Sequence, residues 1–451
     1  MMSDAQFDAW LSRPNAKRVV LAELSHSQGV EYVANRPYIS HADDEAPHRV
    51  YDDVLQGAIE INQRIDSKLE LGALELVDDG SIAHWVDYRW RGYDVLIKLG
   101  APEWRLDDFR VVARQINDGV INARQGKIQL GLYDVTASLA HEIQRPELPS
   151  GQLVPLILGQ VVCAPATRVS TAELRYRVSW LPVTHMVVRD GNGPELSHAE
   201  QYDEGSFVAD AYSPRSLMCD VIEPHDTPGK IVHWVAAHYG LSVAPHDLPD
   251  YICGLRYDGP VTGAQILDDV CQAIGGHWQI DIMGRLRVTV FELPDAANAT
   301  QFDDDDVEQG QIALVETQEP LRSLTLQYAR NYNPITEIAG SVDAVTASRL
   351  RDEFRSLADS RTLPEYPLAP DDTIETALQI EQDVASELGR RMALRAQRHD
   401  VWELKLVTAG LSDILGQSIS VQCRGINGQC GRVISMRSSL LRERTTLEVW
   451  I

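Results

Sequence analysis

The chain has 451 residues, of which 44% are apolar, and 66 Asp and Glu against 41 Lys and Arg give a formal net charge of −25. This charge argues against tight nucleic-acid binding, which needs clustered basic side chains. We interpret it as an ordinary acidic surface, with an acidic wall that DNA passes without sticking as the alternative. The length predicts about three or four compact units. No apolar run reaches the roughly 18 residues of a membrane span. The first residues lack the apolar stretch of a signal peptide.

The first part of the chain, residues 1–148, is predicted to be a β-barrel-like domain. A short helix over residues 7–12 ends before Pro14, and residues 82–91 carry apolar side chains at helical spacing. The rest alternates apolar and polar residues between turns, at the spacing of a barrel or sandwich. The predicted strands cover residues 17–26, 29–40, 68–78, 94–100, 109–120, 121–126 and 127–135.

Residues 149–222 are predicted to form a second, looser β region. Its strands are expected at 154–162, 175–180, 184–190 and 206–212, and the turn-rich sequence RDGNGPE separates two of them.

Residues 223–295 are predicted to form an inserted α+β domain. A helix is expected after Thr227, an N-cap residue followed by Pro228, and before Gly240. A second helix should end at Gly275, after which the period changes to that of a hairpin. Its apolar positions are Ile266, Leu267, Val270 and Ile274, and those of the hairpin are Trp278, Ile280, Ile282, Leu286, Val288 and Val290, with a turn at Met283 and Gly284.

Residues 296–451 are predicted to form a C-terminal domain with a helix and a β-barrel-like part. The helix is expected over residues 374–398, with acidic residues first and arginines last, as the helix dipole favours. A strand that reaches the last residue suggests that the C-terminus closes a barrel. The predicted strands are 323–328, 401–410, 417–423, 431–440 and 445–451. The fold class is therefore α+β and predominantly β, with several small β-barrel or sandwich domains and an inserted helix-plus-hairpin domain.

No sequence motif nominates an active site. A nucleophile elbow, a phosphate-binding glycine loop, a dinucleotide fingerprint and an HExxH motif are all absent. We therefore predict no catalytic, cofactor-binding or metal-ligating residues, no cofactor and no enzyme activity. A pair of glycosidase-type carboxylates stays open as an alternative, because such residues need not be close in sequence.

Several histidines could be imagined as metal ligands. His26, His41 and His48 lie near Asp43 and Asp44, but their spacings match no helical or hairpin ligand geometry. We interpret these histidines as exposed loop residues.

Two other polar groups receive a structural interpretation. His233 and His238 are five residues apart, so they do not share a helix face and are predicted to be partly buried. The run Asp303 to Asp306 could attract calcium, but the EF-hand pattern is absent, and a solvated loop or a helix N-terminus is expected.

The cysteines are too thinly spread to form a disulfide framework. Reduced, buried thiols of a protein made in a cytoplasm are expected. Cys423 and Cys430 have six residues between them, unlike the close pairs of zinc sites, and are interpreted as core or turn thiols, with a metal or a disulfide as the alternative. The six are Cys163, Cys219, Cys253, Cys271, Cys423 and Cys430.

Stretches spread along the chain carry a resemblance to one family. WLSRPNAKRVVLAEL and GVEYVANRPYIS look like the opening of tail proteins of long-tailed phages with Mu-like genomes. VPLILGQVVCAPATRV and VTHMVVRDGNGPE are similar to the middle of those proteins. TPGKIVHWVAAHYG, ILDDVCQAIGGHWQIDIMGRLRVTV and ASELGRRMALRAQRHDVWELKL resemble a tail hub protein, the central component of a baseplate or tail tip.

The resemblance implies a structural virion protein. Family hubs are homotrimers in which two small barrels per subunit build a pseudo-sixfold ring, so a threefold tip can join the sixfold tail tube. The barrels would be 17–145 and one involving the strands of 374–451, with 223–295 at the periphery. The ring would hold the end of the tape measure protein and pass DNA without specific binding during genome ejection. Further expected partners are a distal tail or tail-tube protein and central spike or receptor-binding proteins, which serve host cell attachment.

Three alternatives to the hub stay open. The first is a sixfold distal tail or adaptor ring protein, the second a cell-wall hydrolase of the tail tip, and the third a receptor-binding module. The scattered cysteines do not match the iron–sulfur cluster of some tail-tip proteins, and no fused lysozyme or peptidase domain is visible. The expected location is the virion tail tip, after synthesis in the cytoplasm of the bacterial host.

Overall fold

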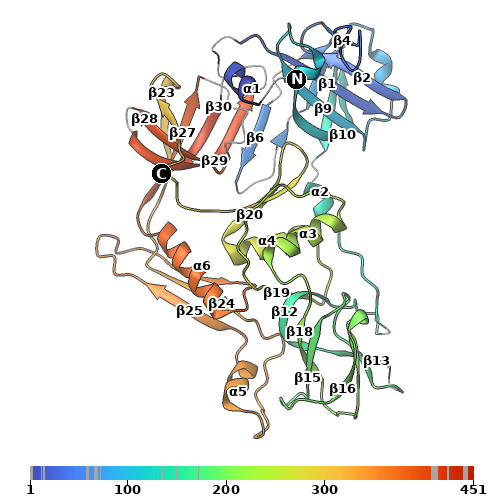
Figure 1. The fold of residues 1–451 in the computed structure, drawn as a ribbon, viewed down its shortest axis with the longest axis vertical. Helices are drawn as coiled ribbons and strands as arrows, with labels where there is room; N and C mark the ends of the chain where they lie inside the picture. Colours follow the sequence, from blue (N-terminus) through green and yellow to red (C-terminus); the bar gives the residue numbers. More distant parts are fainter. Residues whose placement is uncertain are drawn as a thin grey trace.

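The fold was analysed in a computed structural model of the chain (Figure 1). The described residues form six sheets and few helices, which confirms the predicted α+β, mainly β class. In the described part of the chain, no helix is both long and apolar enough to cross a bilayer. The structure describes residues 4–11, 13, 16–56, 60–65, 70–71, 73–124, 126–133, 136–148, 150–170, 172–407, 415–423, 426–439 and 445–451.

The N-terminal unit is a nine-stranded sheet in the order β3-β4-β2-β1-β9-β10-β11-β8-β5. Alternate residues of its strands enter two apolar clusters: Val20 and Ala22 pack with Trp85 and other residues, whereas Val19 and Leu21 pack on the other face. This alternation is the period that predicted the strands. The strands are β1 (Val19–His26), β2 (Gly29–Ala34), β3 (Tyr38–Ile39), β4 (Val50–Asp53), β5 (Leu55–Gln56), β8 (Leu74–Val77), β9 (Asp94–Gly100), β10 (Arg110–Arg124) and β11 (Lys127–Tyr133), and the helices are α1 (Asp4–Leu11), η1 (Ala83–Asp87) and η2 (Leu106–Asp108).

The C-terminal unit is a sheet that nearly closes into a barrel. Its main path runs β22-β28-β29-β30-β27-β23, so its first and last strands follow one another in the chain. The acidic run from Asp303 to Asp306 is the tight turn between them, in which the Asp306 amide donates to the Asp303 carbonyl at 3.1 Å. The strands are β22 (Thr300–Asp303), β23 (Val307–Gln318), β27 (His399–Leu406), β28 (Ser418–Cys423), β29 (Ile426–Ser439) and β30 (Thr445–Trp450).

A strand from the N-terminal part of the chain completes this second sheet. β6 (Glu60–Arg64) pairs antiparallel with β29 and also with the short β7 (Glu70–Leu71). Just beyond β6, the Ile65 amide donates to the Ile434 carbonyl at 2.9 Å, and the Arg64 guanidinium lies 3.0 Å from Glu448. The N-terminal and C-terminal β units therefore lie side by side at one end of the molecule (Figure 1).

The opposite end of the molecule is a sandwich of two four-stranded sheets. Phe207, Cys219 and Val221 are among the buried residues that fill the space between them. The first sheet has the order β15-β18-β12-β19 and the second β13-β14-β17-β16. The strands are β12 (Leu156–Pro165), β13 (Thr167–Ser170), β14 (Arg175–Arg177), β15 (His185–Arg189), β16 (His198–Gln201), β17 (Ser206–Ala209), β18 (Met218–Ile222) and β19 (Gly254–Tyr257), and η3 spans Tyr202–Glu204.

The middle of the molecule contains most of the helical structure. α4 (Gly263–Ile274) begins with a capping box between Thr262 and Gln265 and ends at Gly275, whose φ of 58° is left-handed. The predicted hairpin follows as β20 (Gly276–Ile280) and β21 (Leu286–Val290). The predicted helix after Thr227 is α3 (Pro228–His238). One apolar core joins these elements to the short α2 (Thr136–Leu139), to α6 (Glu381–Leu394) and to the sheet of β24 (Ser323–Tyr328), β25 (Arg355–Ser360) and β26 (Asp371–Glu375).

The predicted helix over residues 374–398 was wrong at its start. Ile374 belongs to β26, a strand parallel to β24 in which Ile374 pairs with Leu326. The helix begins only at Glu381. Pairing with a strand far away in the sequence outweighs the local helical pattern here, as tertiary context often does. The predicted helical face of 82–91 is reduced to the 3-10 helix η1.

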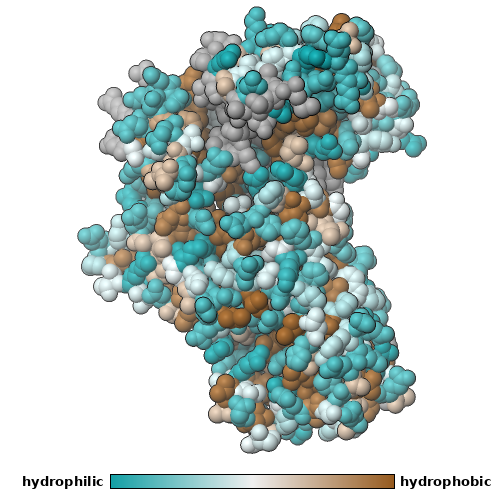
Figure 2. Space-filling model, in the orientation of Figure 1, coloured by the Kyte–Doolittle hydropathy of each residue, from teal (hydrophilic) through white to brown (hydrophobic). Residues whose placement is uncertain are grey.

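Hydrophilic residues cover most of the face drawn in Figure 2, and hydrophobic residues form small patches over the middle of the molecule. This distribution agrees with the formal net charge of −25. Most large apolar side chains are buried in the separate cores.

Candidate functional site

The histidines near Asp43 and Asp44 do not share one environment. His41 and His48 are exposed as predicted, but His26 is buried within β1 and was wrongly predicted to be exposed. Its ring stacks on Tyr88 with centroids 4.1 Å apart. A position in a strand between aromatic rings explains its burial.

Asp44 is a buried structural carboxylate. It accepts hydrogen bonds from the Arg105 side chain at 2.9 Å, the Leu106 amide at 3.0 Å and the His41 amide at 2.7 Å. Burial by itself raises the pKa of Asp44, but these hydrogen bonds outweigh it and the pKa is lowered. Asp44 therefore stays ionised. Its hydrogen bonds connect the loop of residues 41–44 to residues 105–106.

His233 and His238 are both exposed on α3, so the prediction of partial burial was wrong. His233 faces His246 with ring centroids 5.2 Å apart, while His238 stacks on Trp234. The two residues do not act together, in agreement with their five-residue spacing.

The six cysteines are free thiols, and all but Cys430 are buried. Cys423 and Cys430 belong to neighbouring strands but are not opposite one another, because Cys423 pairs with Ile426 and Cys430 with Ser420. Burial raises the pKa of Cys163 to about 12, and it also raises the pKa of the other five thiols. The cysteines are thus protonated packing residues at neutral pH.

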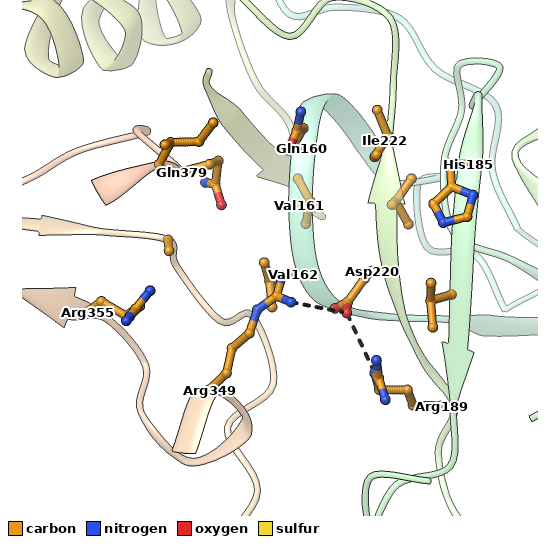
Figure 3. A pocket seen from close by; sticks show the side chains of 14 residues that line it. Gln160, Val161, Val162, His185, Arg189, Asp220, Ile222, Arg349, Arg355 and Gln379 are labelled. Atoms are coloured by element: carbon orange, nitrogen blue, oxygen red, sulfur yellow. Dashed lines mark ion pairs between the residues drawn. The ribbon is translucent and has the colours of Figure 1, made fainter. Parts of the chain in front are cut away.

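A pocket of about 440 Å³ opens where the sandwich meets the sheet of β24 and β25 (Figure 3). Strand alternation builds its floor. Met186 and Val188 of β15 enter the sandwich core, so His185, Val187 and Arg189 point to the other face. The pairing of β15 with β18 and β12 adds residues of the same face, namely Asp220, Ile222 and Gln160.

The opposite wall comes from elements more than a hundred residues later in the chain. Arg349 extends from α5 (Ala344–Arg351), Arg355 begins β25, and Gln379 and Ile380 precede α6. α5 is placed by its N-cap Asp343, whose side chain accepts from the amides of residues 345 and 346. The pocket therefore exists only because two distant segments meet.

Asp220 is the centre of the charged side of the pocket. Its Oδ2 lies 3.6 Å from Arg189 Nε and 3.7 Å from Arg349 Nη1, and its Oδ1 accepts from the Cys163 amide at 3.0 Å (Figure 3). The two guanidinium groups approach from opposite sides, one from each wall. Arg355 lies on the same wall as Arg349 and pairs with the exposed Glu381 at 3.6 Å.

The backbone beside the pocket is unusual. Cys163 has φ 53° and Ala329 has φ 49°, a left-handed conformation that residues other than glycine seldom adopt. Cys163 lies where the walls join, because the carbonyl of its neighbour Val162 accepts from the Tyr332 amide at 3.3 Å. Within the later wall, the Ala329 amide donates to the Leu378 carbonyl at 2.8 Å. Such conformations persist where surrounding contacts determine them, and they often occur at ligand sites.

None of the residues of this pocket was predicted as a site residue. The alternation of His185, Val187 and Arg189 with the apolar Met186 and Val188 was available as a signal for a polar face on a half-buried strand. Nothing local pointed to Arg349 or to the meeting of the two walls.

No model of a known protein family matches the chain, and no curated protein matches it. Among solved structures, it is similar to the 43 kDa tail protein of prophage MuSo2 from Shewanella oneidensis, with 10% identity, a TM-score of 0.44 and coverage of 96% of this chain and 98% of that one. A tail protein from Neisseria meningitidis has 9% identity and a TM-score of 0.47 over 96% and 97% of the two chains. A prophage tail protein from Listeria monocytogenes has 6% identity and a TM-score of 0.44 over 96% and 94%.

Proposed function

We propose that the chain is a structural virion protein that forms the central hub of a phage tail tip. The resemblance of its sequence to tail hub proteins of Mu-like phages supports this proposal, because the resembling stretches extend from Trp10 to Leu406. The observation that carries it furthest is the side-by-side placement of the N-terminal and C-terminal β units, tied together by β6 and β29. Three copies of such a pair would place six β units around one ring.

In this proposal the ring joins the sixfold tail tube to the threefold tip. The lumen surrounds the end of the tape measure protein and later passes DNA, while the sandwich and the helical middle lie outside the ring. The net charge of −25 supports passage without adhesion, because an acidic wall repels phosphates. The role is non-enzymatic, and the partners are the tail tube or distal tail protein, the tape measure protein and the proteins of the central spike or receptor-binding apparatus.

The proposal is tested by the mass of the purified full chain in native mass spectrometry, alone and mixed with tail-tube and tape measure proteins. We expect three copies of the 50.3 kDa chain per particle. Six copies would indicate a distal ring protein, and a monomer that lyses peptidoglycan would contradict the hub.

A matched pair of variants tests the role of the paired β units. Ile65→Pro removes the amide that donates to Ile434 and should prevent trimer formation, because proline cannot donate that hydrogen bond. Glu337→Pro is the control, at an exposed loop residue outside both β units. Circular dichroism checks that both variants are folded. If the Ile65→Pro variant forms a trimer of normal stability, the contact between β6 and β29 does not organise the ring.

A further inference from the structure

We propose that the pocket between the sandwich and the β24–β25 sheet binds the carboxylate of an acidic peptide segment whose apolar neighbours rest on the pocket floor. The volume of about 440 Å³ lies within the roughly 300–1,000 Å³ of ligand pockets in proteins and far exceeds what a single phosphate or carboxylate group fills. The site lies outside the proposed ring, so this inference does not depend on the hub.

The lining is cationic in a strongly acidic chain. Three arginines, Arg189, Arg349 and Arg355, line the pocket with one carboxylate, Asp220. The acids that also contact Arg189 and Arg355 lie outside the lining: Glu195 is 66% exposed and Glu381 is 60% exposed. The Arg355–Glu381 pair is exposed at both side chains and is therefore weak, so Glu381 competes poorly with an incoming carboxylate. Arg189 is 11% exposed and keeps a 2.9 Å contact with Glu195.

The guanidinium groups retain donors for a ligand. A guanidinium has five N–H groups, which match a carboxylate in pairs. Arg349 and Arg355 contact their acids at 3.7 and 3.6 Å, beyond hydrogen-bond distance, and their side chains donate no hydrogen bond to any residue that the structure describes. The buried Nε of Arg189 also has no hydrogen-bond partner among the described residues.

Apolar residues on the floor favour a peptide over a free anion. Val187 and Ile222 are half-buried on the sheet face, and Ile380 is 42% exposed at the opposite wall. A phosphate ion would contact only the arginines and would leave these apolar surfaces exposed to water. A segment with an acidic residue beside aliphatic ones would cover both parts of the pocket.

Asp220 then acts as an internal competitor for the arginines. Its Oδ2 faces Arg189 and Arg349 from the floor side at 3.6 and 3.7 Å. Its second oxygen accepts the Cys163 amide, a hydrogen bond that an asparagine can still accept. Neutralising Asp220 should therefore strengthen the binding of an anion without removing this backbone contact.

Isothermal titration calorimetry of the full chain tests the proposal with three probes: the C-terminal amide of acetyl-valyl-glutamate, the C-terminal amide of acetyl-valyl-glutamine, which has no carboxylate, and inorganic phosphate. The glutamate peptide should bind at least about tenfold more tightly than the glutamine peptide, because hydrogen bonds to charged groups are the stronger ones. Arg349→Gln should weaken this binding by about tenfold, and Asp220→Asn should strengthen it. Arg351→Gln, an exposed residue of the same helix outside the lining, is the matched control and should have no effect.

The three probes and three variants separate the outcomes. Equal binding of the two peptides, or equal weakening by Arg349→Gln and Arg351→Gln, would overturn the proposal. Weaker binding by Asp220→Asn would overturn it as well, since a purely structural Asp220 is expected to give that result. Phosphate binding as tight as that of the glutamate peptide would support an oxyanion site but overturn the assignment to a peptide.

Discussion

Glu387 and Asp220 are each shared by two arginines, but the contact distances differ. In α6, Glu387 Oε1 lies 2.6 Å from Arg390 Nη2 and 2.6 Å from Arg391 Nε, and the glutamate side chain is 1% exposed. In the pocket, Asp220 Oδ2 is 3.6 and 3.7 Å from its two arginines and its side chain is 18% exposed. We call the Glu387 cluster closed, because its contacts are short and buried, and the Asp220 cluster open, because its contacts are longer than a hydrogen bond.

The closed cluster completes the end of another helix. Arg390 donates to the Ile274 carbonyl at 2.9 Å, and Arg391 donates to the Ala273 carbonyl at 3.1 Å, both at the C-terminus of α4. The last carbonyls of a helix lack intrahelical partners and attract cations. Glu387 holds both arginines in position because all three residues follow one another along one face of α6.

The open cluster draws its arginines from two separate walls, β15 and α5. Their positions are set by the packing of those walls and not by a shared helix, so the contacts to Asp220 stay long. The same residue types therefore stabilise the fold when they share one helix face, whereas arginines from two separate walls keep only long contacts with their carboxylate.

Glu387→Gln should have the largest effect on stability. It leaves two arginines without their carboxylate at a buried position, which typically costs about 3–5 kcal/mol. Urea unfolding of the full chain measures the free energy, and Asp220→Asn is the matched control, with an expected loss below about 1 kcal/mol. Similar losses in both variants would remove the distinction between the clusters.

Leu267→Ala should come next, at about 2–4 kcal/mol. Leu267 is fully buried in the core that α4 shares with its hairpin, so truncation leaves a cavity. Leu368 is 87% exposed, and Leu368→Ala should change the free energy of unfolding by less than about 0.5 kcal/mol. Thermal and urea unfolding compare the two variants.

Thr262→Ala should cost about 1 kcal/mol, because the Thr262 hydroxyl accepts from the Gln265 amide in the capping box at the start of α4. Thr262→Ser retains the hydroxyl and should recover most of the loss. If serine and alanine are equally destabilising in urea unfolding, the cap does not act through this hydrogen bond.

Arg349→Gln should have the smallest effect on stability, within about 0.5 kcal/mol, because its side chain is 48% exposed and its ion pair is long. The substitution should instead weaken the binding of the glutamate peptide. Unfolding in low and high salt checks this, and a loss comparable to that of Glu387→Gln would mean that the pocket arginines stabilise the fold.

Much of the local fold could be predicted from residue patterns. The helix that ends at Gly275 and the hairpin after it are predictable because the apolar period changes at the glycines and each element fits its own period. The strand predicted over residues 17–26 likewise corresponds to β1. The candidate pocket was not predicted at all, since its two walls are separated by more than a hundred residues.

The sequence by itself determined the mainly β class, the separate apolar segments and the ends of several elements, because these depend on the period and turn chemistry of neighbouring residues. Only the tertiary structure decided that Ile374 lies in a strand, that β6 joins the C-terminal sheet and that Arg189 and Arg349 meet at Asp220. These features depend on pairing between distant segments, which becomes favourable only when the whole chain folds and which no local pattern specifies.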